Sequence, residues 1–69
     1  MYLKHIIACA LILGMVDQIS DGIATVEYEV GDSIYHSQVS LDLSACQPTE
    51  GQWVYFYKDY KIVTCVEKI

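Results

Sequence analysis

Three cysteines are the side chains of this 69-residue sequence with the widest covalent and metal chemistry. Cys9, Cys46 and Cys65 are far apart, and no pair has the Cys-x-x-Cys spacing that is typical of zinc sites. Cys46 and Cys65 flank the last predicted hairpin, so a disulfide between them is geometrically feasible and is the candidate bridge. The alternative, which we favour from sequence, is three buried thiols in a reducing cytoplasm.

The remaining polar residues show no catalytic arrangement. His5 and His36 are isolated histidines, and Asp17-x-x-x-Asp21-Gly22 has too few oxygen ligands for a calcium loop. No Ser/His/Asp or Cys/His grouping and no glycine-rich phosphate loop is present in the sequence. We therefore predict that the chain is not an enzyme and that it uses no metal and no cofactor.

An aromatic ladder, Trp53, Tyr55, Tyr57 and Tyr60, is expected on one face of the last hairpin. Aromatic side chains on small β-barrels stack the bases of single-stranded nucleic acid, usually beside a basic groove. This chain has four lysines, no arginine and a net charge of −5, so nucleic acid is a poor candidate partner. Core or protein interface is the use we favour. A small planar ligand or nucleotide held between subunits is a further hypothesis.

Acidic side chains dominate the middle of the sequence. Between Lys4 and Lys58 there is no Lys or Arg, while seven Asp and Glu residues lie in this span. The simplest interpretation is solubility, and the second is an acidic face that docks on a basic groove of another protein. The predicted partner-binding residues are Trp53, Tyr55, Tyr57, Glu27, Glu29 and Asp32.

The first element that must position these residues is an apolar leader. IIACALILGMV, residues 6–16, contains eleven consecutive apolar residues. A membrane-spanning helix needs about 20, so a simple anchor is not expected. A signal peptide that ends near Ala24 is an alternative and would make the protein exported or membrane-associated. We favour a first β-strand covered on both faces, because such strands are continuous apolar runs.

A strand covered on both faces has a consequence for assembly. One sheet has one interior, so the second face of the strand needs another cover, and little of the remaining sequence has a helical pattern. A second copy of the chain is the expected cover. We therefore predict a homodimer or a higher closed oligomer with Ile6, Ile12 and Val16 at the interface.

The middle of the sequence predicts antiparallel strands joined by tight turns. Ser20-Asp21-Gly22 is a strong turn signal, and a three-residue loop there would pair Val16 with Val26 and Ile19 with Ile23. The following segment, IATVEYEV, alternates apolar and polar residues as a half-buried strand does. Gly31-Asp32 marks the next turn, and IYHSQVSLDL, residues 34–43, follows as the next expected strand.

The end of the sequence predicts one more hairpin. WVYFY and YKIVTCV flank Lys58-Asp59, and a two-residue loop would pair Tyr55 with Ile62 and Val54 with Val63. Five such strands in order predict a single all-β domain over residues 1–69, with 1–16 as apolar leader and first strand. The expected fold is a five-stranded antiparallel meander that curls into a small SH3-like or OB-like barrel.

Two segments carry a family resemblance. VDQISDGIATVEYE, residues 16–29, resembles the opening of a family of tiny uncharacterised domains with a Val-Asp-Arg-Ile-Glu-like start, an acidic turn and Ala-x-Val-Glu. EGQWVYF, residues 50–56, is similar to the Glu-Gly-x-x-Val-x-Phe-like segment of that family. Small open reading frames of bacteriophages look similar, although Gln18 departs from the pattern, where Arg is common. The resemblance covers about residues 15–65 and implies a fold and a phage origin, without an activity.

Together these features predict a non-enzymatic β-domain that self-associates and binds a protein partner in the cytoplasm of a bacterial host. If it is encoded by a phage, an accessory or host-takeover role is expected. The first alternative is an exported or membrane-associated protein with residues 1–24 as leader and Cys46–Cys65 bridged. The second is an oligomeric binder of a small molecule or nucleotide at subunit seams.

Overall fold

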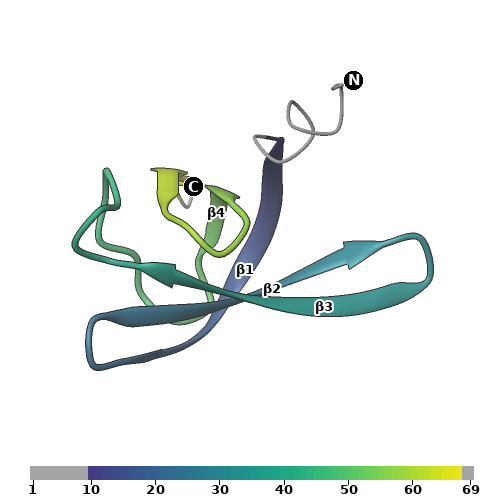
Figure 1. Ribbon diagram of the computed structural model, residues 1–69, viewed down its shortest axis with the longest axis horizontal. Coiled ribbons are helices and arrows are strands. Elements are labelled where there is room, and N and C mark those ends of the chain that lie inside the picture. The colour runs from purple at the N-terminus through teal and green to yellow at the C-terminus, as the bar shows by residue number, and fades with distance from the viewer. Residues whose placement is uncertain (1–9, 68–69) are drawn as a thin grey trace, which may run out of the picture.

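The computed structural model describes residues 10–67, which contain five β-strands (Figure 1). All strand pairs are antiparallel and belong to one sheet, which confirms the predicted all-β class. The part of the predicted first strand at residues 6–9 lies outside the described residues. The strands are β1 (Leu11–Ser20), β2 (Ile23–Val30), β3 (Ser33–Ser40), β4 (Trp53–Tyr57) and β5 (Ile62–Cys65).

The order of the strands differs from a sequential meander. The sheet has the order β3-β2-β1-β4-β5, so β4 pairs with β1 and not with β3. The connection of residues 41–52 carries the chain from β3 across to the far side of β1. β1 therefore becomes the central strand, where its apolar sequence is paired along both edges.

The sheet is strongly curled and does not close into a barrel (Figure 1). Its edge strands are β3 and β5, and they approach each other at one corner only. There Ser40 forms an isolated parallel bridge with Lys61, and the Ser40 N–H donates to the Tyr60 carbonyl at 2.9 Å. The predicted SH3-like or OB-like barrel is thus an open, curled sheet.

A two-residue turn and a bulge set the first hairpin. Asp21 and Gly22 both have positive φ, 53° and 76°, as a tight hairpin turn requires. The turn has two residues and not the predicted three, so Ile19 pairs with Ala24 and not with Ile23. Val16 pairs with Val26 as predicted, because the register shifts between Val16 and Gln18. The bulge also shifts the alternation, so that Val16 and Ile19 both turn toward the core.

The register of the last hairpin also differs from the prediction. The Tyr60 N–H donates to the Tyr57 carbonyl at 3.0 Å, and the following strand begins only at Ile62. Phe56 then pairs with Ile62, and an irregularity follows toward Tyr55. The expected pairs of Tyr55 with Ile62 and Val54 with Val63 are wrong; the observed partners are Thr64 and Cys65.

The core lies inside the curl of the sheet and draws residues from all five strands. Cys46, Cys65 and three further side chains, Ile12, Ile19 and Leu41, pack around its edge. Alternation in β2 buries Ala24, Val26 and Tyr28 as the sequence predicts. The buried apolar residues are Val16, Ala24, Val26, Tyr28, Val39, Val54, Phe56 and Ile62.

Candidate protein-interaction surface

The register between β1 and β4 collects six large side chains on one side of the sheet. Ile12, Gly14 and Val16 turn toward the core, so the alternating residues of β1 turn outward. The same alternation in β4 buries Val54 and Phe56 and turns their neighbours outward. We call the resulting surface the outer face; its cross-strand pairs are Leu11–Tyr57, Leu13–Tyr55 and Met15–Trp53.

Exposure separates the outer face from the core. Trp53 is 50% exposed and Tyr55 is 37% exposed, whereas Val54 and Phe56 in the same strand are fully buried. Trp53 and Tyr55 therefore lie on the surface, where an interface would need them. Tyr60 follows β4 in the turn, and Lys61 Nζ lies 5.2 Å from the centre of its ring. Three residues of the predicted aromatic ladder, Trp53, Tyr55 and Tyr57, therefore lie on the outer face. The fourth, Tyr60, lies apart from them in the turn.

The predicted interface residues of the first strand lie on its other side. Val16 is 1% exposed and Ile12 packs against the same core, so both belong to the interior of the chain itself. Ile6 lies outside the described residues. Leu11 and Leu13 are 51% and 46% exposed, so one face of β1 is covered by this chain and the other is not. The exposed face of β1 is thus formed by residues other than the predicted interface residues Ile12 and Val16.

A groove borders the outer face between β1 and β2. Registered pairing of these strands ends at Met15 and Glu27, and beyond that point the β2–β3 hairpin diverges from β1 (Figure 1). The groove has a volume of about 360 Å³. Its lining residues are Leu13, Met15, Glu27, Tyr28, Glu29 and Trp53.

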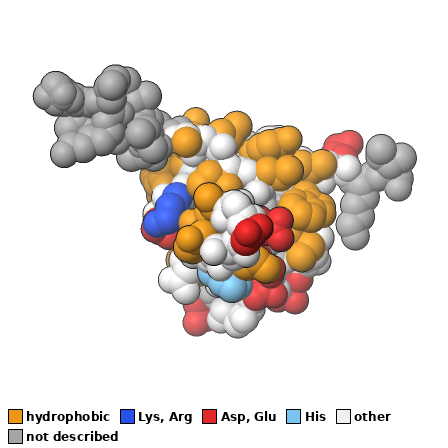
Figure 2. Space-filling view, turned by 90° about the vertical axis from the view of Figure 1, so that its right-hand side faces the viewer, with side chains coloured by type: hydrophobic (Ala, Val, Ile, Leu, Met, Phe, Trp, Pro, Cys, Tyr) orange, Lys and Arg blue, Asp and Glu red, His pale blue; other side chains and the backbone are white. Residues whose placement is uncertain are grey.

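The groove combines apolar walls with two carboxylates. Glu27 is half-buried beside Met15, and Glu29 is the next outward position on β2. Among residues 10–67 the ion pair is formed by Lys58 and Asp59, so neither glutamate has a basic partner there. At the β2–β3 hairpin end of the molecule, acidic side chains lie among hydrophobic ones (Figure 2).

The structure therefore brings together half of the predicted partner-binding residues in the groove. Trp53, Glu27 and Glu29 line it. Tyr55 and Tyr57 continue the outer face along β4. Asp32 lies in the β2–β3 turn and is not among the lining residues. The residues that sequence reasoning missed are Leu13 and Met15, which only the β1–β4 register places beside Trp53 and Tyr55.

A second polar cluster joins β3 to the last turn. The Ser37 hydroxyl is buried and donates to Asp59 Oδ1 at 3.1 Å, while the Asp59 N–H donates to Ser37 Oγ at 2.7 Å. A hydrogen bond from Lys58, followed by those from Ser37 and the Gln38 N–H, holds the pKa of Asp59 below its ordinary value, although partial burial opposes the shift. The same contact with Asp59 raises the pKa of Lys58. This cluster ties the two sheet edges together at the corner where they approach.

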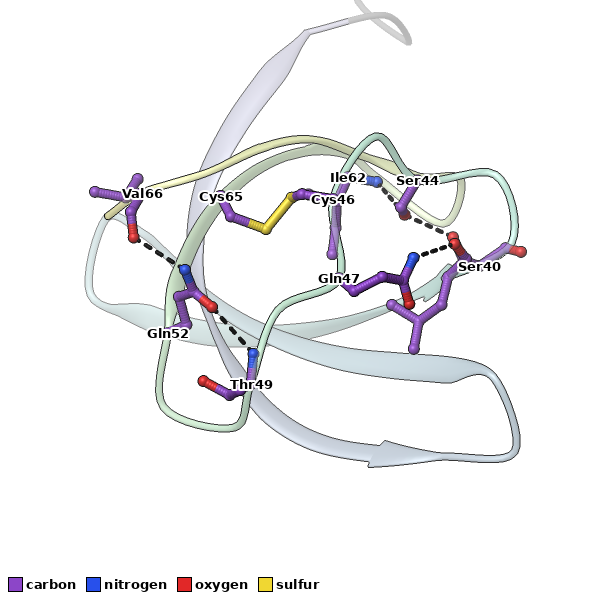
Figure 3. The surroundings of a disulfide bond; sticks show 10 residues. Ser40, Ser44, Cys46, Gln47, Thr49, Gln52, Ile62, Cys65 and Val66 are labelled. Carbon is purple, nitrogen blue, oxygen red and sulfur yellow. Dashed lines mark hydrogen bonds between the residues drawn. A yellow bond between two sulfur atoms is a disulfide. The ribbon is translucent and has the colours of Figure 1, made fainter. Parts of the chain in front are cut away.

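The connection that reorders the strands is held by a disulfide. Cys46 and Cys65 are bridged, with their Cα atoms 6.1 Å apart (Figure 3). The favoured interpretation of three free thiols is therefore wrong for this pair, and Cys9 lies outside the described residues. Because β5 carries Cys65 and the connection carries Cys46, the bridge ties residues 41–52 to the edge of the sheet.

Side-chain hydrogen bonds hold the rest of this connection (Figure 3). The Ser44 hydroxyl donates to the Ser40 carbonyl at 2.6 Å and accepts from the Ile62 N–H at 2.8 Å. Gln52 accepts from the Thr49 N–H and donates to the Val66 carbonyl. The connection is thus hydrogen-bonded to the sheet near both of its ends.

We also searched the described residues for a metal-binding cluster and for a membrane-spanning helix. Residues 10–67 contain no cluster of three or more His, Cys, Asp or Glu side chains that could hold a metal ion. Over the same residues, no helix has the length and apolar character needed to cross a membrane.

Comparison with known proteins adds no relative. No family model matches the chain, and neither a curated protein nor a solved structure does. Function therefore has to be inferred from the outer face and its groove.

Proposed function

We propose that this chain is a non-enzymatic protein-binding domain whose outer face docks a partner protein. The observation that carries the proposal is the set of three cross-strand pairs on so small a sheet, Leu11–Tyr57, Leu13–Tyr55 and Met15–Trp53. Four of these side chains are exposed, and Met15 and Tyr57 are half-buried. Small soluble domains rarely expose contiguous apolar surface of this kind unless it is used. Tyr, Trp and Met are also the side chains that are enriched at the centre of protein interfaces.

Capture of the partner from a host lysate tests this proposal when matched variants are compared. Immobilised wild-type protein is expected to retain a protein that Leu11→Asp loses, because a carboxylate on the apolar part of the outer face, away from the groove, would have to be desolvated on docking. Val30→Asp is the control, since Val30 is 59% exposed and belongs neither to the outer face nor to the lining of its groove. Identical retention by all three proteins would contradict a role for the outer face.

Self-association is a second candidate, favoured by the free edge of β3. The N–H groups of Gln38 and Ser40 point away from β2 and donate to Asp59 and Tyr60. Backbone groups alternate along a strand, so those of Ile34 and His36 point to the same edge, where residues 10–67 supply no partner.

The composition of this edge favours pairing with a second copy. β3 is eight residues long and contains no Lys, Asp, Glu or Pro, the side chains that usually protect an edge strand. We propose an antiparallel homodimer through β3. Sedimentation equilibrium at tens of micromolar is expected to show a dimer that Ile34→Lys converts to monomer, while Leu43→Lys does not. A wild-type monomer under these conditions would remove the proposal.

Origin and compartment belong to the same proposal. The resemblance of residues 16–29 and 50–56 supports a bacteriophage-borne accessory or host-takeover protein. The Cys46–Cys65 bridge supports an exported form, because disulfides persist in oxidising compartments. Loss of residues 1–24 would delete β1, the central strand, so an exported form needs to retain it. Mass spectrometry of alkylated protein from its native host, with and without reductant, tests whether the bridge is present there.

A further inference from the structure

We infer that the groove between β1 and β2 receives a lysine or arginine side chain of the partner protein. This inference rests on the proposed function of the outer face and identifies the chemistry that the face selects. The groove opens beside Trp53 and Met15, so a segment docked along β1 and β4 would pass its mouth.

The shape of the groove suits a long side chain. Its volume of about 360 Å³ lies at the lower end of the range of roughly 300–1,000 Å³ that is typical of ligand-binding clefts. Leu13, Met15 and Trp53 provide apolar wall, while Glu27 and Glu29 contribute carboxylates from β2. Lys and Arg have an aliphatic stem that packs on apolar surface and a charged head that stays with polar groups. A purely apolar side chain would leave the carboxylates without a partner.

The two glutamates of the groove favour a positively charged ligand. Glu27 and Glu29 are consecutive outward positions on β2, and Glu27 is half-buried. The described lysines are engaged elsewhere, since Lys58 pairs with Asp59 at 2.9 Å and Lys61 lies over the ring of Tyr60. No lysine of residues 10–67 therefore pairs with Glu27 or Glu29. A positively charged side chain of a partner would be attracted by both carboxylates.

Trp53 adds a further reason for a cation. An ammonium or guanidinium group near the face of an indole ring is attracted by its π electrons. An acidic ligand would be repelled by both glutamates and by the net charge of −5. The groove thus favours a basic side chain flanked by apolar residues, which can cover the rest of the outer face.

A fluorescence titration tests the inference, because Trp53 is the single tryptophan of the chain. The probes are the peptides acetyl-Ala-Ile-Lys-Ile-Ala-amide and the same peptide with norleucine in place of lysine. Norleucine keeps the apolar stem and removes the charge. The lysine peptide is expected to shift Trp53 emission with a Kd about tenfold or more below that of the norleucine peptide. Raising the salt from about 50 to 500 mM is expected to narrow this difference.

Matched variants assign the effect to the groove. The double variant Glu27→Gln/Glu29→Gln is expected to bind the two peptides equally, whereas Asp17→Asn/Asp42→Asn, which neutralises two exposed acids that do not line the groove, is expected to keep the preference. Circular dichroism checks that both variants are folded.

Three results would overturn the inference. The first is equal binding of both peptides by the wild type, which leaves the outer face as an apolar docking surface. The second is no response of Trp53 to either peptide. The third is a shift of Trp53 emission with protein concentration alone, because a second copy would then occupy the groove. The lysate comparison of Leu11→Asp with Val30→Asp tests the proposed function independently of all three, because neither residue lines the groove.

Discussion

Gly14 lies against Val26 with no room for a side chain between them. A β-carbon at Gly14 would be 2.7 Å from Val26 Cγ1 and 2.6 Å from the Glu27 carbonyl oxygen. Phe56 closes the third side, with its ring 3.0 Å from the same point. The glycine therefore allows β1 to lie close to the core residues of β2 and β4, and it fixes which face of β1 is the inner one.

Gly14→Ala is expected to destabilise the protein by about 1–3 kcal/mol, because backbone or packed side chains have to move to admit the methyl group. The change in the free energy of unfolding, measured by urea denaturation, checks this expectation. Leu13→Ala is the control: it places alanine at the adjacent position of β1, on the exposed side. A Gly14→Ala variant as stable as the wild type would show that β1 and β2 are less tightly packed than described.

The Cys46–Cys65 bridge is expected to contribute about 3 kcal/mol, because it closes a loop of roughly 20 residues in the unfolded chain. Cys46→Ala/Cys65→Ala should therefore lower the melting temperature by more than about 10 °C for a domain of this size. Thermal denaturation with and without reductant measures the effect. Reductant should lower the melting temperature of the wild type and leave that of the double variant unchanged. An equal melting temperature for the oxidised wild type and the double variant would contradict the expected contribution.

Local pattern was sufficient to find the strands. The alternation of IATVEYEV and the turns at Asp21-Gly22 and Gly31-Asp32 depend on neighbouring residues, and the structure has both turns and the buried side chains of β2 where the pattern places them. The strand order could not be found in this way. It depends on the connection of residues 41–52 and on the Cys46–Cys65 bridge, which join segments distant in the sequence.

The candidate site shows the same division. The outward positions of Trp53, Tyr55 and Tyr57 follow from period-two alternation within one strand. Their neighbours Leu13 and Met15 follow from the pairing of β1 with β4, which no local pattern specifies. Alternation along the first strand correctly assigned Ile12 and Val16 to one face and Leu11, Leu13 and Met15 to the other. Both faces are apolar, so their composition did not show which of them packs against the core.

Asp59 is expected to make stability depend on pH in the acid range. Its pKa is lower in the folded protein than in the unfolded chain, chiefly through the Lys58 hydrogen bond and also through Ser37. The stabilisation is therefore complete above the unfolded value of about 3.9 and is lost as the pH falls through the lower folded value. Urea denaturation at pH 7, at pH 4 and below checks this dependence.

Two substitutions separate the charge of Asp59 from its hydrogen bonds. Asp59→Asn keeps an acceptor for Ser37 and tolerates the positive φ of 55°. It should be less sensitive to acid than the wild type, while Asp42→Asn, at an exposed position, should follow the wild type. An Asp59→Asn variant that loses stability with acid as steeply as the wild type would assign the acid dependence to other carboxyl groups.

Adjacent residues of β4 are expected to differ in what they contribute. Phe56 is fully buried, and Phe56→Ala should cost about 3–5 kcal/mol of folding free energy. Tyr55 turns outward opposite Thr64, so Tyr55→Thr, which keeps a β-branched side chain suited to a strand, should change stability by no more than about 0.5 kcal/mol. Partner capture by Tyr55→Thr should nevertheless fall, because the ring belongs to the docking surface. A large loss of stability in Tyr55→Thr would instead make the outer face a structural element of the isolated domain.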